Sequence, residues 1–307
     1  MKTAAVIGNC QARAIADYLS IRFHDVSFET FGIHLIPPKE IQRKSIEFFD
    51  RARSCFNFVI TAPLSPLYGA LFIENQEAVL GQDKLIRIPS IYFSGLHPDL
   101  TYLGGPGGRT LGPLGDYHSK LALIGFLSGY STLETIRLFN MDTYLKMEYH
   151  LEAETSLHQL KHREQKVDVP VSRIIEENFQ RVPCFMTVNH PTSFLFTEYT
   201  DSLVEYITSR GIAKPSAPSL NYHFRPNPLS GAAIFPMYPE IAEINKTEYK
   251  GGYHFKSPEH KGKSRVFSLE EFIESEFKAF EKVGIDYLQS DPKAKTVFGQ
   301  WKLFMGG

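Results

Sequence analysis

The chain has 307 residues, of which 33 are Lys or Arg and 34 are Asp or Glu, so its formal charge is −1 with histidine neutral. A nearly neutral surface has no long-range field to attract phosphate backbones or an anionic membrane, which argues against a dedicated nucleic-acid-binding protein. Three cysteines are too few for a disulfide scaffold, and an odd number leaves one thiol unpaired. We therefore expect a globular protein of the reducing cytoplasm.

The sequence predicts neither a membrane span nor a secretion signal. Lys2 precedes a short apolar run, but Asn9 and Arg13 interrupt it well before the length of a signal-peptide core. The longest stretch without charge, residues 54–73, contains Pro63 and several polar residues, which argues against a continuous helix through lipid.

The first third of the chain alternates short apolar runs with helical patterns. Strands are expected at residues 3–8, 26–31, 57–62 and 85–93. Helices are expected at residues 11–22 and 38–51. Strand–helix–strand alternation predicts an α/β fold, with a small parallel sheet in the N-terminal part and helices around it.

The composition of the sequence changes at residues 104–115, which contain six glycines and two prolines and are expected to form a loop. Helical patterns dominate beyond this loop. We expect an α/β part at residues 1–103 and a mainly helical part at residues 104–307 packed on it. A single composite domain is the alternative.

Two helix starts in the second part have the spacing of a capping box, in which a Ser side chain and a Glu three residues later exchange hydrogen bonds with each other's backbone. One pair is Ser131 with Glu134, and the other is Ser268 with Glu271. The helix that follows Ser268 is expected to bury Phe272, Ile273, Phe277 and Phe280.

The most distinctive local pattern is AAVIGNCQA at residues 4–12. A nucleophile elbow has a strand, a tight turn that carries the nucleophile, and a helix, with small residues two positions before and after the nucleophile. Gly8 and Ala12 hold those positions around Cys10. The helix would direct its free N–H groups and positive dipole end at the sulfur, which favours the thiolate. The alternative is a small buried hydrophobic cysteine, the commoner role of a free Cys.

The same turn offers donors for an oxyanion. We expect the backbone N–H of Gln11 and the side-chain amide of Asn9 or Gln11 to stabilise negative charge beside Cys10. Cys55 and Cys184 lack this setting, and we expect both in the core.

A thiol nucleophile usually needs a base, typically histidine. His97 follows the apolar run at residues 85–93, and Pro98 holds it extended, so that Asp99 points the same way and can orient it. His190 follows another apolar run and is the second candidate. For each histidine, a single structural hydrogen bond is the alternative role.

The glycine-rich loop leads into residues that begin a helix. Such an arrangement can hold phosphate, with Arg109, Ser119 and Lys120 as donors, or it can be a surface loop that binds nothing. His158 and His162 lie four residues apart, but no HExxH or paired CxxC motif accompanies them, so we predict no metal site.

Several short motifs occur together along the chain: GNCQA at residues 8–12, Ile88-Pro89, Phe93, His97-Pro98-Asp99, Tyr117-His118-Ser119 and Asn189-His190-Pro191. Together they resemble the WcbI family of capsular polysaccharide biosynthesis enzymes. The resemblance covers most of residues 1–210, and the C-terminal third carries no matching motif. The motif order is also similar to that of SGNH-type esterases, with Cys in place of their Ser.

The WcbI resemblance implies a coenzyme A-binding protein that O-acetylates a capsule sugar, with Cys10 and His97 as the motif cysteine and histidine. The cofactor is expected on Arg13 and on the 109–120 region, through Arg109, His118, Ser119 and Lys120. A thiol esterase or deacetylase of carbohydrate esters is one alternative, and a non-catalytic binding protein of a polysaccharide pathway is another. The oligomeric state and the acceptor sugar are left open.

Overall fold

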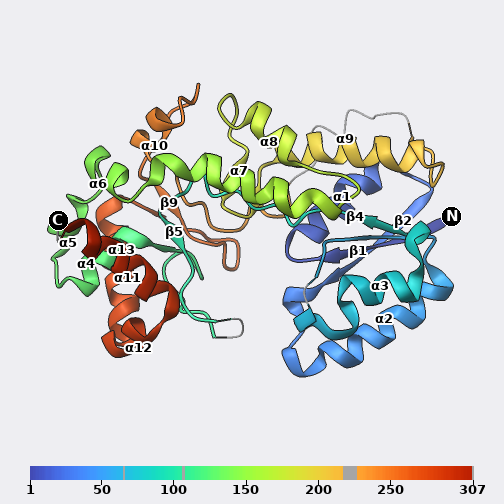
Figure 1. Cartoon of the computed structure of the whole chain (residues 1–307), viewed down its shortest axis with the longest axis horizontal. Helices are drawn as coiled ribbons and strands as arrows, with labels where there is room; N and C mark the ends of the chain where they lie inside the picture. Colours follow the sequence, from blue (N-terminus) through green and yellow to red (C-terminus); the bar gives the residue numbers. More distant parts are fainter. Residues whose placement is uncertain (65, 106–107, 217–226, 306–307) are drawn as a thin grey trace. The chain divides into compact units, whose positions relative to one another are not determined.

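The computed structural model describes residues 1–64, 66–105, 108–216 and 227–305 (Figure 1). The chain forms two compact units, each assembled from separate stretches. Unit one comprises Met1–Tyr92, His158–Asn178 and His190–Ser230, and unit two comprises Phe93–Leu157, Phe179–Asn189 and Gly231–Gly307. The first boundary between the units follows Tyr92, and two later stretches return to the first unit. The division into parts at residues 1–103 and 104–307 stays a prediction.

Unit one is built on a four-stranded parallel sheet in the order β2-β1-β3-β4. The strands are β1 (Lys2–Gly8), β2 (Val26–Gly32), β3 (Phe58–Thr61) and β4 (Leu85–Arg87). In β1, residues 4–7 have no exposed surface, as expected of a strand covered on both faces. Since the strands are parallel, the carboxyl ends of all four meet at one edge.

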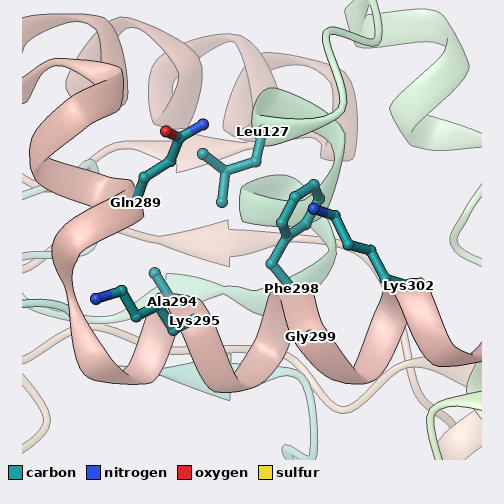
Figure 2. A pocket seen from close by; sticks show the side chains of 7 residues that line it. All are labelled: Leu127, Gln289, Ala294, Lys295, Phe298, Gly299 and Lys302. Atoms are coloured by element: carbon teal, nitrogen blue, oxygen red, sulfur yellow. The ribbon is translucent and has the colours of Figure 1, made fainter.

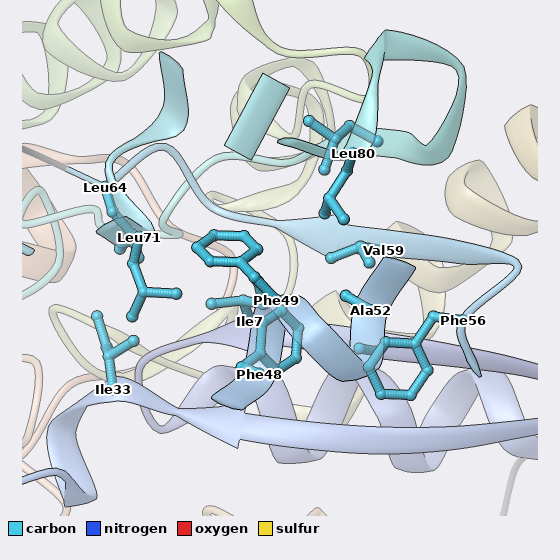
Figure 3. Packing of buried hydrophobic residues seen from close by; sticks show 12 residues of the cluster. Ile7, Ile33, Phe48, Phe49, Ala52, Phe56, Val59, Leu64, Leu71 and Leu80 are labelled. Atoms are coloured by element: carbon cyan, nitrogen blue, oxygen red, sulfur yellow. The ribbon is translucent and has the colours of Figure 1, made fainter. Parts of the chain in front are cut away.

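Helices cover both faces of this sheet. Figure 1 shows α1 (Gln11–Arg22) and α9 (Ser193–Ser209) on one face, with α2 (Ile41–Cys55) and α3 (Ile73–Leu80) on the other. Phe48, Phe49 and Ala52 of α2 pack against Ile7 and Val59 of the strands (Figure 3). The remaining helices with residues in this unit are α7 (Glu152–Arg163), which begins in unit two, and α8 (Ser172–Asn178).

Unit two is mainly helical, so the predicted fold class is confirmed. Its helices are α4 (Lys120–Leu127), α5 (Thr132–Ile136), α6 (Met141–Lys146), α10 (Pro239–Ile244), α11 (Leu269–Val283), α12 (Ile285–Ser290) and α13 (Pro292–Met305). Two short antiparallel pairs join β5 (Leu100–Thr101) to β6 (His118–Ser119) and β9 (Phe255–Lys256) to β10 (Val266–Phe267). The short strand β7 (Phe185–Thr187) also belongs to this unit.

Local signals in the sequence predicted helix starts well. Both capping boxes are present, with reciprocal bonds between Ser131 and Glu134 and between Ser268 and Glu271. Within α11, however, Phe277 is only half-buried, and Glu276 occupies the buried position that a helical pattern assigns to an apolar residue.

Two other predictions about the fold were wrong. The fourth strand ends at Arg87 rather than at residue 93, because the buried residues that follow lie in irregular chain. Cys55 is exposed at the end of α2, whereas Cys184 is buried as predicted. No helix in the described part of the chain combines the length and the hydropathy that a membrane span requires.

Candidate functional site

Cys10 occupies the turn between β1 and α1, at the edge where the parallel strands end. Its backbone is already helical (φ −55°, ψ −21°), and the N–H of Ala12 donates to the carbonyl of Asn9 at 3.1 Å. A Cβ on Gly8 would lie 3.5 Å from that of Ala12, so the strand and the helix approach closely. The predicted strand–turn–helix is therefore present, and Cys10 is half-exposed.

The side chains on either side of Cys10 fix this turn. The N–H of Gln11 donates to Asn9 Oδ1 at 3.0 Å, which fixes the turn before α1. Gln11 Nε2 donates to the carbonyl of Ile91 at 2.7 Å, and Gln11 Oε1 accepts from the Ile91 N–H at 3.1 Å. The Gln11 N–H and one N–H of its side-chain amide are thus used within the fold, and the oxyanion contact expected of Gln11 stays a prediction.

The segment after β4 completes this edge of the sheet. Asn9 Nδ2 donates to Ser90 Oγ at 3.3 Å, and Gln11 bonds to the next residue of that segment, Ile91. Arg87 holds the strand end, because its N–H donates to Asp168 Oδ2 at 2.6 Å and its guanidinium pairs with Glu77. Ser90 was missed by the sequence reasoning, although it follows the Ile88-Pro89 pair that marked the family resemblance.

Two further candidates lie in unit one. Arg13 is in the first turn of α1, where its side chain is 69% exposed and pairs with Asp17 at 3.0 Å. His190 lies in β8 (His190–Pro191), and burial lowers the pKa of its imidazole to about 4. His190 is therefore neutral near pH 7.

His97 lies in unit two and is almost fully buried. Burial lowers the pKa of His97 to about 4, and the backbone carbonyls of Pro236 and Phe185 only partly oppose that shift. Neither ring nitrogen makes a hydrogen bond of standard geometry within the described residues. A buried imidazole without a firm partner is unusual in a folded protein, and strongly shifted buried histidines are enriched at functional sites.

Asp99 does not orient His97, so the predicted pair is corrected. The Asp99 carboxylate has no exposed surface and accepts hydrogen bonds from four donors in unit two. These donors are Ser119 Oγ, the Leu121 N–H, Tyr149 Oη and Tyr238 Oη. Asp99 thus joins distant segments of its own unit, and both of its carboxylate oxygens accept hydrogen bonds from those segments.

His118 is part of a second buried network in unit two. Its Nδ1 lies 2.9 Å from Glu276 Oε2, and its Nε2 lies 3.0 Å from the carbonyl of Thr110. Burial, the largest single effect, opposes the imidazolium, but Glu276, the Thr110 carbonyl and Asp116 together raise the pKa of His118. A Cβ on Gly112 would lie 2.6 Å from Glu276 Oε1, so glycine there lets the loop cover the pair. His118 is consequently not placed to bind a cofactor.

Ser119 and Lys120 also have structural partners. Ser119 caps α4 by accepting from the Ala122 N–H at 3.0 Å, in addition to its bond to Asp99. Lys120 Nζ donates to the carbonyl of Pro98 at 2.6 Å, and burial lowers the pKa of its ammonium. Both predicted phosphate donors are therefore engaged within unit two.

Arg109 is different, because its guanidinium is only partly covered. One of its N–H groups donates to the carbonyl of Gly104 at 3.1 Å, and its guanidinium carbon lies 4.7 Å from the ring centre of Tyr102. Residues 106–107 of the predicted loop lie outside the described residues. Of the candidates in residues 109–120, Arg109 keeps the most donor capacity for a ligand.

Two cavities have linings that include none of the predicted site residues. One, of about 340 Å³, is formed by α13 with Leu127 and Gln289, and Figure 2 shows Lys295, Phe298 and Lys302 around it. The other, of about 540 Å³, lies by Lys2 and Val26, where β1 and β2 begin, and so at the sheet edge opposite Cys10. No group of three or more His, Cys, Asp or Glu that could bind a metal ion occurs in the described residues.

The model of one protein family, described as polysaccharide biosynthesis enzyme WcbI, matches residues 3–210. This chain belongs to the WcbI family. A solved WcbI structure is similar over 100% of this chain and 95% of its own, with a TM-score of 0.69 and 16% identity. It is described as a novel polysaccharide biosynthesis enzyme, the native protein without a disulfide bond between coenzyme A and one of its cysteines. No curated protein matches the sequence.

Membership of the WcbI family makes this protein a polysaccharide biosynthesis enzyme. The family match ends at residue 210, at the end of α9, whereas the structural similarity covers the whole chain. The segment after residue 210 therefore belongs to the shared fold, although it contributed no motif to the resemblance.

Proposed function

We propose that this enzyme transfers an acetyl group from acetyl-coenzyme A to a sugar hydroxyl of a capsular or surface polysaccharide, with Cys10 as the nucleophile. One observation carries the proposal: a half-exposed Cys10 lies at the N-terminus of α1, directly after a central strand of the sheet. Ligands of open α/β sheets bind at this edge, and a helix N-terminus favours the thiolate.

Coenzyme A is supported as the cosubstrate by the WcbI structure, whose description relates the cofactor to a cysteine of that protein. We extend that relation to Cys10, because it is the cysteine of the GNCQA motif. A thiol that reaches the sulfur of coenzyme A also reaches the neighbouring carbonyl carbon of acetyl-coenzyme A.

The proposed reaction has two balanced steps. The Cys10 thiolate attacks the acetyl carbonyl carbon, a new carbon–sulfur bond forms, and the coenzyme A thiolate leaves and takes up a proton. The sugar hydroxyl then attacks the acetyl-thioenzyme and loses its proton to a base, and the Cys10 thiolate is released. One thioester is converted into another and then into an ester, so no redox partner is required.

His97 is the proposed base, with His190 as the alternative. Burial lowers the pKa of both imidazoles, so each is in the neutral form that a base requires near pH 7. We assign the oxyanion contact to Asn9 Nδ2. Ser90 uses only one of its two N–H groups, so the second can donate to the oxyanion. Arg13, which is exposed in unit one, is one proposed contact for phosphates of the cofactor, and Arg109, which is partly exposed in unit two, is another.

The proposal is tested with acetyl-coenzyme A and a capsule oligosaccharide, by following acetylated product for the wild type, Cys10→Ala and the control Cys55→Ala. We expect a loss of at least about a thousandfold for Cys10→Ala and none for Cys55→Ala, which removes an exposed thiol at the end of α2. Unchanged transfer by Cys10→Ala would exclude the nucleophile role.

Two other outcomes identify the alternatives. Release of acetate without transfer would indicate a thiol esterase or deacetylase, for which coenzyme A should not raise the melting temperature. If neither reaction occurs and Cys10 reacts with iodoacetamide no faster than Cys55, a non-catalytic binding protein is indicated.

A further inference from the structure

Two cationic side chains of unit two contact one aromatic ring. The guanidinium carbon of Arg109 lies 4.7 Å from the ring centre of Tyr102, and Lys293 Nζ lies 5.2 Å from the same centre. Arg109 lies within the glycine-rich segment at residues 104–115, whereas Lys293 is in the first turn of α13. The charge of Arg109 is near enough to lower the pKa of Lys293, so the two cations repel each other.

A buried carboxylate positions both cations. Asp291 Oδ1 accepts from the N–H groups of Lys293 and Ala294 at 2.8 and 2.9 Å, which caps the start of α13. Asp291 Oδ2 accepts from the N–H of Gly104 at 2.8 Å, which ties the loop to the helix. Arg109 in turn donates to the carbonyl of Gly104. The capping residue that orders Lys293 therefore also orders Arg109, and both of its oxygens are used.

Neither cation has a carboxylate partner within 4.0 Å in the ranges that the structure describes. Burial and the nearby Arg109 lower the pKa of Lys293, and Asp291 only partly opposes them. Lys293 is nevertheless exposed and Arg109 partly so, which leaves donors of both side chains accessible to a ligand.

We infer that Arg109 and Lys293 form a binding site for a phosphate group of a small molecule. A guanidinium presents a planar fork that matches two phosphate oxygens, and an ammonium adds a second charge and three donors. Two cations on one ring match a phosphate monoester or diphosphate better than a single carboxylate.

This inference goes beyond the proposed acetyl transfer, because Lys293 lies in the part of the chain outside the family match at residues 3–210. Two ligands carry the required chemistry: coenzyme A, with its diphosphate and 3′-phosphate, and a phosphorylated sugar such as a nucleoside diphosphate sugar. Binding of coenzyme A at this site rests on the proposed function, whereas binding of a phosphorylated sugar does not.

The test is isothermal titration calorimetry of the full chain with inorganic diphosphate, coenzyme A and a uridine diphosphate sugar. Lys293→Met and Arg109→Met remove the two charges, and Lys302→Met is the matched control. Lys302 lies on the same helix, is exposed, and contacts a single ring, with Nζ 4.6 Å from the centre of Phe298. Circular dichroism melting checks that every variant is folded.

We expect diphosphate and at least one of the two larger ligands to bind about tenfold more weakly to Lys293→Met and to Arg109→Met, with Lys302→Met unchanged. Weaker binding of coenzyme A identifies the cofactor as the ligand, and weaker binding of the sugar nucleotide alone identifies the sugar substrate. The site is refuted if the wild type binds none of the three ligands, or if both variants bind all of them as the wild type does. Failure of coenzyme A alone to bind the wild type counts against the proposed function but leaves the other two titrations to decide the site.

Discussion

The polar residues at the end of β1 and those around Asp99 are used in opposite ways. Near Cys10, the side chains of Asn9 and Gln11 bond locally or to the chain after β4, and Cys10 itself is half-exposed. Around Asp99 in unit two, the polar groups are fully buried and bond to one another. An exposed reactive side chain on a turn that hydrogen bonds hold in place is typical of a reactive site. A buried network whose polar groups bond only to one another is typical of a structural role.

The largest effect on folding is expected from Asp99→Ala. This change removes the acceptor of three buried hydroxyl donors and one backbone N–H, and each orphaned donor costs about 1–3 kcal/mol. We expect the free energy of unfolding to fall by about 4 kcal/mol or more, measured by urea denaturation. The control Asp286→Ala, in the exposed first turn of α12, should change it by less than about 0.5 kcal/mol. Equal effects of the two substitutions would show that Asp99 is not part of the scaffold.

Acid should destabilise the protein through its buried histidines. The folded-state pKa of His97 is lowered to about 4, so between about pH 6.5 and 4 the unfolded chain binds more protons and the free energy of unfolding falls as the pH falls. The loss across this range is about 3 kcal/mol for His97 and is complete below about pH 4.

Denaturation of His97→Gln over the same pH range measures this contribution. The slope of stability against pH should be smaller in this variant than in the wild type. His158→Gln, which alters an exposed histidine of α7, should keep the wild-type slope. An unchanged slope in His97→Gln would contradict the role of burial at His97.

Gln11→Ala tests whether the turn at Cys10 is held from the segment after β4. The change leaves the buried N–H and carbonyl of Ile91 without their partner, at a cost of about 2 kcal/mol. Acetyl transfer should also fall about tenfold, since the turn loses its support. The exposed Gln82→Ala should alter neither quantity. Full activity in a destabilised Gln11→Ala would show that the Gln11–Ile91 bonds stabilise the fold but are not needed for acetyl transfer.

The smallest effect on folding is expected at Arg13. Because its pair with Asp17 is exposed, Arg13→Gln should change the free energy of unfolding by less than about 0.5 kcal/mol. Under the proposed function, coenzyme A should nevertheless bind several-fold more weakly, as a thermal shift titration would show. Unaltered binding would remove Arg13 from the cofactor site.

The sequence predicted the elements whose signals are local. The helix at Gln11–Arg22 and both capping boxes depend on residues a few positions apart, and the turn at Cys10 follows from the small residues around it. The strand expected at residues 85–93 was too long, because buried irregular chain is as apolar as a strand.

Local sequence patterns could not predict the structural roles of His118, Ser119 and Asp99. Glu276 lies 158 residues from His118, and Tyr238 lies 139 residues from Asp99, so nothing near these residues indicates that their bonds are already used. One signal was available: Glu276 lies four residues from both Phe272 and Phe280, within the apolar face of its helix. A carboxylate in that position indicates a buried partner.

Intact-protein mass spectrometry after incubation with acetyl-coenzyme A, in the absence of an acceptor sugar, tests the central claim most directly. The account predicts a mass increase of one acetyl group that maps to Cys10, is absent in Cys10→Ala and disappears when acceptor oligosaccharide is added. An acetylated product from the acceptor, formed at the wild-type rate by Cys10→Ala without any such adduct, would contradict it.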